Sequence, residues 1–75
     1  MEILCNAKIG SIVKIENLTA KDVLKERFLS LGLTRGAKVE VLRKGPKNNL
    51  TVFRIRGAMI ALRNEESSLI YVSES

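Results

Sequence analysis

The chain has 75 residues, 45% hydrophobic and 28% charged, with a formal net charge of +5 and no histidine. A chain of this length is expected to form one domain over residues 1–75, with little room for a catalytic cleft beside a packed core, so we expect a binding module and no enzyme. The positive charge favours an acidic protein, a nucleic acid or an anionic membrane face as partner, although the basic residues form no long run.

The cellular location is suggested by what the sequence lacks. Cys5 is the single cysteine, so no internal disulfide can form, and the first residues lack the basic and apolar regions of a signal peptide. No apolar run approaches the length of about 18 residues that a membrane span needs. We therefore expect a cytoplasmic protein without stable insertion into a membrane.

The first regular elements predicted along the chain are a strand over Ile12–Glu16 and a helix over Thr19–Leu31. The helix is indicated by apolar residues at helical spacing, which would form one buried face. This apolar stripe consists of Ala20, Val23, Leu24, Phe28 and Leu31. We expect it to cover one open end of the fold.

The start of this helix carries three local signals. Thr19 suits the N-cap position, because its hydroxyl can accept a bond from a free backbone N–H group. Asp22 follows three residues later and completes a capping-box pattern, while Leu18 and Val23 are spaced as a hydrophobic staple. The sequence therefore predicts a helix that begins directly after Thr19.

The end of the helix is marked by glycine. Gly32 suits the left-handed residue that closes a helix, and Leu33 would then fold back on Phe28 in a Schellman motif. Gly36 marks the turn into the next strand. This junction between helix and strand is the strongest local signal in the chain.

The second half of the sequence is typical of short strands. Predicted are strands over Lys38–Lys44, Leu50–Arg56, Met59–Arg63 and Leu69–Val72, and a capped helical turn over Asn64–Ser68. Alternation places one set of side chains inward, namely Val39, Val41, Thr51, Phe53, Ile55, Ile60 and Leu62. Gly45–Asn49 is a loop, and Gly57-Ala58 is predicted to form a type II′ hairpin turn.

This order of elements predicts the fold class. Five short strands in so few residues can bury one face each by curling into a barrel. We expect an all-β, small five-stranded SH3-like barrel with one helix inserted after the first strand and a short helical turn before the last.

Three segments of the sequence resemble the FeoA family. They are Arg27–Gly36 (R-F-L-S-L-G-L-T-R-G), Val39–Val41 (V-E-V) and Arg56–Arg63 (R-G-A-M-I-A-L-R). The likeness extends from about Gly10 to Val72. Arg35 departs from the pattern, because the family often has proline there. A proline ring would fix the backbone φ angle in the turn before Gly36, and arginine does not.

The resemblance implies an SH3-like barrel and a cytoplasmic partner of FeoB, the membrane protein of bacterial ferrous-iron uptake. Proteins of this family are usually considered adaptors or regulators of that transporter. The same module occurs fused to metal-dependent repressors. The resemblance also implies transition-metal binding, so a weakly bound divalent transition metal is a possible cofactor.

Few residues of this chain are good metal ligands. Asp22 and Glu26 lie one predicted helical turn apart, and Cys5 stands alone. Ferrous iron is commonly held by imidazole, which this chain lacks. Helix capping explains Asp22, and an inert half-buried thiol explains Cys5. The metal ligands therefore stay unassigned, with these three residues as candidates.

The candidates for partner binding are basic and apolar side chains without a predicted place in the core. The basic group is Arg43, Arg54, Arg56 and Arg63, which neighbouring antiparallel strands could gather into one cationic face. The apolar group is Leu29, outside the helical stripe, and Met59, near a hairpin tip. Each of these residues also fits an ordinary solvated surface.

Two further functions stay open on the sequence alone. A nucleic-acid-binding barrel fits the positive charge but lacks aromatic residues on which bases could stack, so a nucleic acid is disfavoured as partner. A metal-responsive regulatory module is the other alternative. The sequence does not decide whether the chain forms homo-oligomers.

Overall fold

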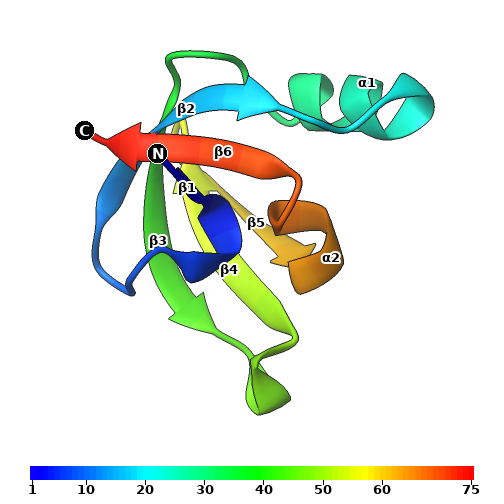
Figure 1. Cartoon of the computed structure of the whole chain (residues 1–75). Helices are drawn as coiled ribbons and strands as arrows, with labels where there is room; N and C mark the ends of the chain where they lie inside the picture. The colour runs from blue at the N-terminus through cyan, green and yellow to red at the C-terminus, as the bar shows by residue number, and fades with distance from the viewer.

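The computed structural model describes the backbone of all 75 residues and every side chain except that of Asn48. Six strands and two short helices follow one another, with two single turns of 3-10 helix (Figure 1). Their bounds are β1 Glu2–Ile3, η1 Leu4–Asn6, β2 Ile12–Leu18, α1 Asp22–Ser30, β3 Lys38–Lys44, η2 Pro46–Asn48, β4 Leu50–Ile55, β5 Ala58–Arg63, α2 Asn64–Ser67 and β6 Ile70–Glu74.

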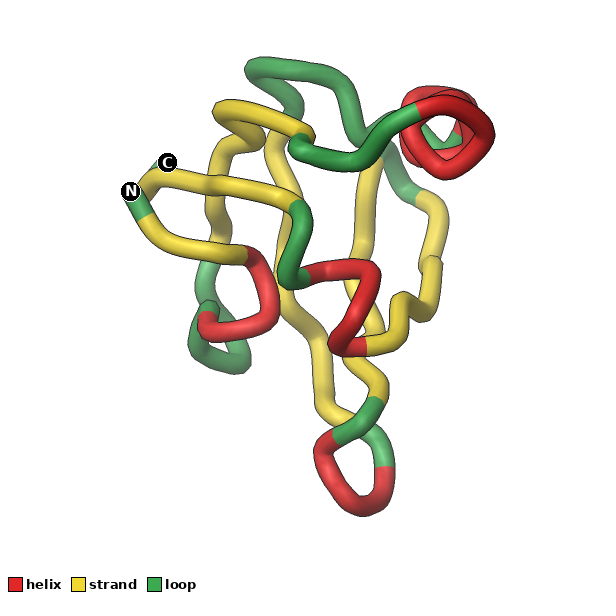
Figure 2. Tube along the Cα trace, turned by 45° about the vertical axis from the view of Figure 1, so that its right-hand side comes forward, coloured by secondary structure: helices red, strands yellow, loops and turns green.

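The strands form one antiparallel sheet in the order β1-β6-β2-β3-β4-β5. The register shifts between Ile15 and Asn17 on β2 and between Val41 and Arg43 on β3. Such bulges bend a sheet, and Figures 1 and 2 show it curled around a common interior. The predicted SH3-like barrel class is confirmed, but the sheet stays open between its edge strands β1 and β5.

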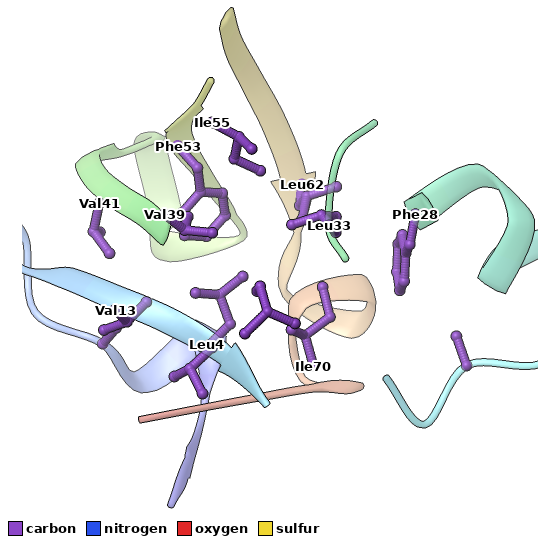
Figure 3. Packing of buried hydrophobic residues seen from close by; sticks show 14 residues of the cluster. Leu4, Val13, Phe28, Leu33, Val39, Val41, Phe53, Ile55, Leu62 and Ile70 are labelled. Atoms are coloured by element: carbon purple, nitrogen blue, oxygen red, sulfur yellow. The ribbon is translucent and has the colours of Figure 1, made fainter. Parts of the chain in front are cut away.

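The core lies inside the curled sheet. Phe53 on β4 is fully buried beside Val39 on β3, and Phe28 reaches the core from α1 (Figure 3). Of the seven residues predicted to point inward, Ile60 is half-buried and the other six are buried. Alternation at period two was therefore a sufficient signal for the inner face of β3, β4 and β5.

The first residues of the chain belong to the core, which the sequence analysis missed. Glu2 and Ile3 pair with Val72 and Tyr71 of β6, and η1 follows at once. Leu4 and Ala7 are only 1% and 2% exposed. A two-residue strand is too short to show alternation, so no periodic signal could have revealed it.

The start of α1 contradicts the predicted cap. The helix begins at Asp22, with Lys21 at the N-cap position and no side-chain cap bond. Thr19 Oγ1 and the Thr19 N–H group both donate to the carbonyl of Leu69, at 2.9 and 2.8 Å. Thr19 thus lies two residues before the N-cap position and does not cap the helix, and Val23 is 79% exposed, which contradicts the predicted staple.

The end of α1 agrees with the prediction. Gly32 has a φ of +94°, and its N–H group donates to the carbonyl of Leu29 at 3.0 Å. The N–H group of Leu33 donates to the carbonyl of Phe28, also at 3.0 Å. These two bonds form the Schellman motif, and both Phe28 and Leu33 are fully buried.

The turn between β4 and β5 differs from the predicted one. Ile55 pairs with Ala58, so the two central residues are Arg56 and Gly57, with φ values of +52° and +82°. Two positive φ angles make this a type I′ turn. The predicted Gly57-Ala58 turn would also leave Phe53 and Leu62 inward, so alternation could not distinguish the two registers.

Candidate partner-binding surface

The strand register places four of the six predicted partner-binding residues on one face. Glu40, Arg54 and Met59 form one row across β3, β4 and β5, and Arg43, Val52 and Ala61 form the next. Arg63 lies opposite Leu50 at the end of β5. We call this the outer face, consisting of Glu40, Arg43, Val52, Arg54, Met59, Ala61 and Arg63.

Positive charge dominates the outer face. Arg54 Nη1 lies 3.1 Å from Glu40 Oε1, and the two side chains are 49% and 38% exposed, so water screens this pair and it contributes little to stability. Arg43 and Arg63 are exposed and form no ion pair with any residue that the structure describes. Met59, at 59% exposed, adds an apolar side chain to this face, opposite Arg54.

The sequence analysis missed Val52 and Ala61 as members of this face. Val52 is half-buried and Ala61 exposed, and they lie opposite each other in the register. The alternation that assigned Thr51 and Phe53 to the interior already implied an outward Val52. Glu40 lies between the inward Val39 and Val41, so alternation also implied that it points outward, but its pairing with Arg54 depends on the register between β3 and β4.

Arg56 lies apart from the outer face. Its place in the turn directs Nη2 to the hydroxyl of Thr34, at 3.2 Å. A Cβ added at Gly32 would lie 3.4 Å from Ile55 Cγ2 and 3.7 Å from Arg56 Cδ. The junction after α1 and the β4–β5 hairpin therefore pack against each other.

Leu29 also lies elsewhere, at a shallow groove of about 180 Å³ between α1 and β2. Its side chain is 42% exposed, and Lys25, Arg35 and Glu16 line the same groove. The Ser73 hydroxyl donates to Glu16, and this bond, with weaker help from the nearby cations Lys14 and Arg35, holds the pKa of Glu16 below its usual value of 4.5. Leu29 therefore occupies a surface separate from the outer face, whereas the other apolar candidate, Met59, lies among the arginines.

The three metal-ligand candidates are not brought into one cluster. Asp22 and Glu26 are exposed on α1, whereas Cys5 lies half-buried in η1 with its Sγ 3.9 Å from Asn6 Oδ1. Among the residues that the structure describes, no group of three or more metal-ligating side chains occurs. The described helices are also too short and too polar to cross a membrane.

Comparison with known proteins identifies the family. The FeoA domain matches residues 3–74 of the chain. The chain belongs to the FeoA family. A Helicobacter pylori protein named for Fe(2+) transport is 32% identical over 68 residues, which cover 91% of this chain and 87% of that protein.

Solved structures of FeoA proteins share this fold. The solution structure of FeoA from Chlorobium tepidum is 29% identical, with a TM-score of 0.90 over 96% of this chain and 69% of that one. A zinc complex of Stenotrophomonas maltophilia FeoA, described as a prokaryotic SH3 domain protein, is 22% identical, with a TM-score of 0.85. That likeness covers 97% of this chain and 91% of the other, and it confirms the SH3-like fold.

The predicted FeoA resemblance is thus confirmed, and it relates the chain to ferrous-iron transport. The segments that carried the resemblance, Arg27–Gly36 and Arg56–Arg63, meet where Arg56 contacts Thr34. The family pattern therefore marks a packing contact between two distant parts of this chain.

Proposed function

We propose that this FeoA-family protein is a cytoplasmic adaptor that docks on the cytoplasmic part of FeoB and regulates ferrous-iron uptake. It would perform no catalysis itself. Its effect would be a population shift: preferential binding to one state of the transporter biases the equilibrium between states.

The observation that carries this proposal is the outer face. It combines the exposed cations Arg43, Arg54 and Arg63 with an exposed Met59 on one side of a small, fully packed sheet. Arginine and methionine are enriched at protein interfaces, and complementary charge speeds association with an acidic surface. The net charge of +5 favours the same class of partner.

Binding to the purified cytoplasmic part of FeoB from the same organism tests the proposal. We expect Arg54→Ala and Met59→Ala each to weaken binding about tenfold, as expected of residues near the centre of an interface. We expect Glu40→Gln to strengthen it, because Glu40 offsets the charge of Arg54. Isothermal titration calorimetry would measure all three.

Lys21→Ala provides a matched control, since Lys21 is an exposed cation that precedes α1 and lies outside the outer face. Equal binding by the outer-face variants and this control would contradict the assigned surface. Absence of binding by the unmodified chain would contradict the adaptor role. Tight binding of RNA or DNA, with a steep salt dependence, would support the nucleic-acid alternative instead.

A further inference from the structure

Strand β5 is an open edge of the sheet. It pairs with β4 on one side, and none of the described residues forms a strand on the other. Natural edge strands are usually blunted by charges or proline, because their free backbone groups attract other chains. The sequence of β5 is A-M-I-A-L-R, with its one charge at the last residue.

The hairpin register shows which backbone groups face this open side. In a two-residue hairpin the residues flanking the turn form a hydrogen-bonded pair, and such pairs then alternate along the strands. Ile55 and Ala58 flank the turn, so Ala58, Ile60 and Leu62 bond to β4. The N–H group of Asn64 donates to the Asn49 carbonyl at 3.0 Å, which continues the alternation. Met59, Ala61 and Arg63 therefore direct their backbone groups away from the sheet.

Helix α2 closes the far end of this edge. Glu66 Oε1 accepts a bond of 3.0 Å from the N–H group of Arg63, and the Ser67 hydroxyl donates to the Arg63 carbonyl at 3.3 Å. No bond among the described residues engages the N–H or carbonyl groups of Met59 and Ala61. Two donors and two acceptors thus stand open, beside side chains that are themselves exposed.

We propose that the open edge of β5 pairs with an extended, acidic segment of a partner protein, which adds a further strand at Met59 and Ala61. The free donors and acceptors fit a peptide backbone, as in other cases of strand addition. The inference rests on the proposed function for the identity of that partner, a segment of the transporter.

The positive charge around β5 favours an acidic segment over a second copy of this chain as the partner. Arg63 lies on β5 itself, Arg54 on the next strand, and Arg56 in the adjoining turn. The nearby carboxylates Glu40 and Glu66 are already paired with Arg54 and Arg27, and Glu65 lines the same surface pocket as Arg63. Two copies that each carry +5 would repel each other.

A short capped peptide of alternating glutamate and valine tests the edge directly. Added to the ¹⁵N-labelled full chain, it should slow hydrogen exchange at the Met59 and Ala61 amides by about tenfold or more, because both become hydrogen-bonded. The amides of Ala58 and Ile60 already bond to β4 and should change little. A lysine–valine peptide should bind about three- to tenfold more weakly, since it lacks the attraction to the arginines.

Ala61→Pro and Ala61→Val form a matched pair of variants. Proline removes an outward N–H group without breaking the ladder to β4, so the fold should persist, whereas valine keeps that group. We expect Ala61→Pro to abolish binding of the glutamate peptide and Ala61→Val to retain it. If Ala61→Pro fails to fold, the exchange rates of the unmodified chain still decide the matter.

Three outcomes would overturn the inference. The first is unchanged hydrogen exchange at the Met59 and Ala61 amides when the glutamate peptide is added. The second is equal binding of the glutamate and lysine peptides. The third is self-association of the chain, if the Ala61→Pro substitution abolishes it. Peptide binding without binding of FeoB would uphold the open edge and contradict the adaptor role. Binding of FeoB that Ala61→Pro leaves unchanged would uphold docking and contradict strand addition.

Discussion

A single buried residue, Thr51, lowers the stability of this small core. Its side chain is 2% exposed and lies between Lys44 and Leu62 in the register. Thr51 Oγ1 is the one buried side-chain oxygen or nitrogen of the described residues without a hydrogen-bond partner. Burial of an unpaired hydroxyl opposes folding, because water is lost and no bond replaces it.

We predict that Thr51→Val raises the free energy of unfolding by about 1 kcal/mol, since a methyl group replaces the unpaired hydroxyl. Urea denaturation of the two proteins would measure the difference. Thr51→Ser is the control, because it keeps the hydroxyl and loses a methyl group, and it should lower stability by about 0.8 kcal/mol. A valine variant less stable than the unmodified chain would show that the hydroxyl does have a partner.

At the scale of elements, the two ends of α1 differ in what determines them. The C-terminal end depends on Phe28, Leu29, Gly32 and Leu33, which are close together in sequence, so a local pattern predicts it. Before the N-terminal end, Thr19 is bonded to Leu69, fifty residues away, a contact that no local pattern contains. The helix begins only at Asp22, so Thr19 lies outside the cap position that the sequence offered.

We predict that Gly32→Ala destabilises the protein by roughly 1–2 kcal/mol, the cost of a left-handed conformation for a residue with a side chain. The new Cβ would also lie 3.4 Å from Ile55 Cγ2. Gly36→Ala is a matched control, because Gly36 has a φ of +86° and open space around it. The difference between their thermal midpoints therefore reports the contacts with Ile55 and Arg56. Equal stability of Gly32→Ala and the unmodified chain would contradict the Schellman end.

On the scale of the whole molecule, closure of the interior depends on segments far apart in sequence. The N-terminal β1 pairs with the C-terminal β6, and the two chain ends lie close together in both views (Figures 1 and 2). Leu4, directly after β1, is buried in the core (Figure 3). Helix α1, by contrast, contributes a single fully buried side chain, Phe28, and lies beside the sheet.

We predict that Leu4→Ala lowers the free energy of unfolding by about 2–4 kcal/mol, because it leaves a cavity in a core too small to repack easily. Met1→Ala should change it by less than about 0.5 kcal/mol, since Met1 is 85% exposed. Chemical denaturation of both variants provides the measurement. A Leu4 variant as stable as the Met1 variant would show that the N-terminal segment is dispensable for the core.

Local sequence patterns were sufficient to predict the features that depend on near neighbours. Alternation identified Phe53 and Ile55 as inward, and Gly32 with Leu33 predicted the helix end. The same alternation implied that Arg54, Met59 and Arg63 point outward, and therefore part of the outer face. Each of these depends on steric or periodic rules that act over a few residues.

The tertiary structure decided what depends on register and on contacts between distant segments. It selected Arg56-Gly57 as the turn, separated Arg56 and Leu29 from the outer face, and left the edge of β5 open. When a hairpin register shifts by one residue on each strand, the same side chains still point inward. The pattern of alternation therefore fits both turns, and only the packing of the whole core distinguishes the Arg56-Gly57 turn from the Gly57-Ala58 turn.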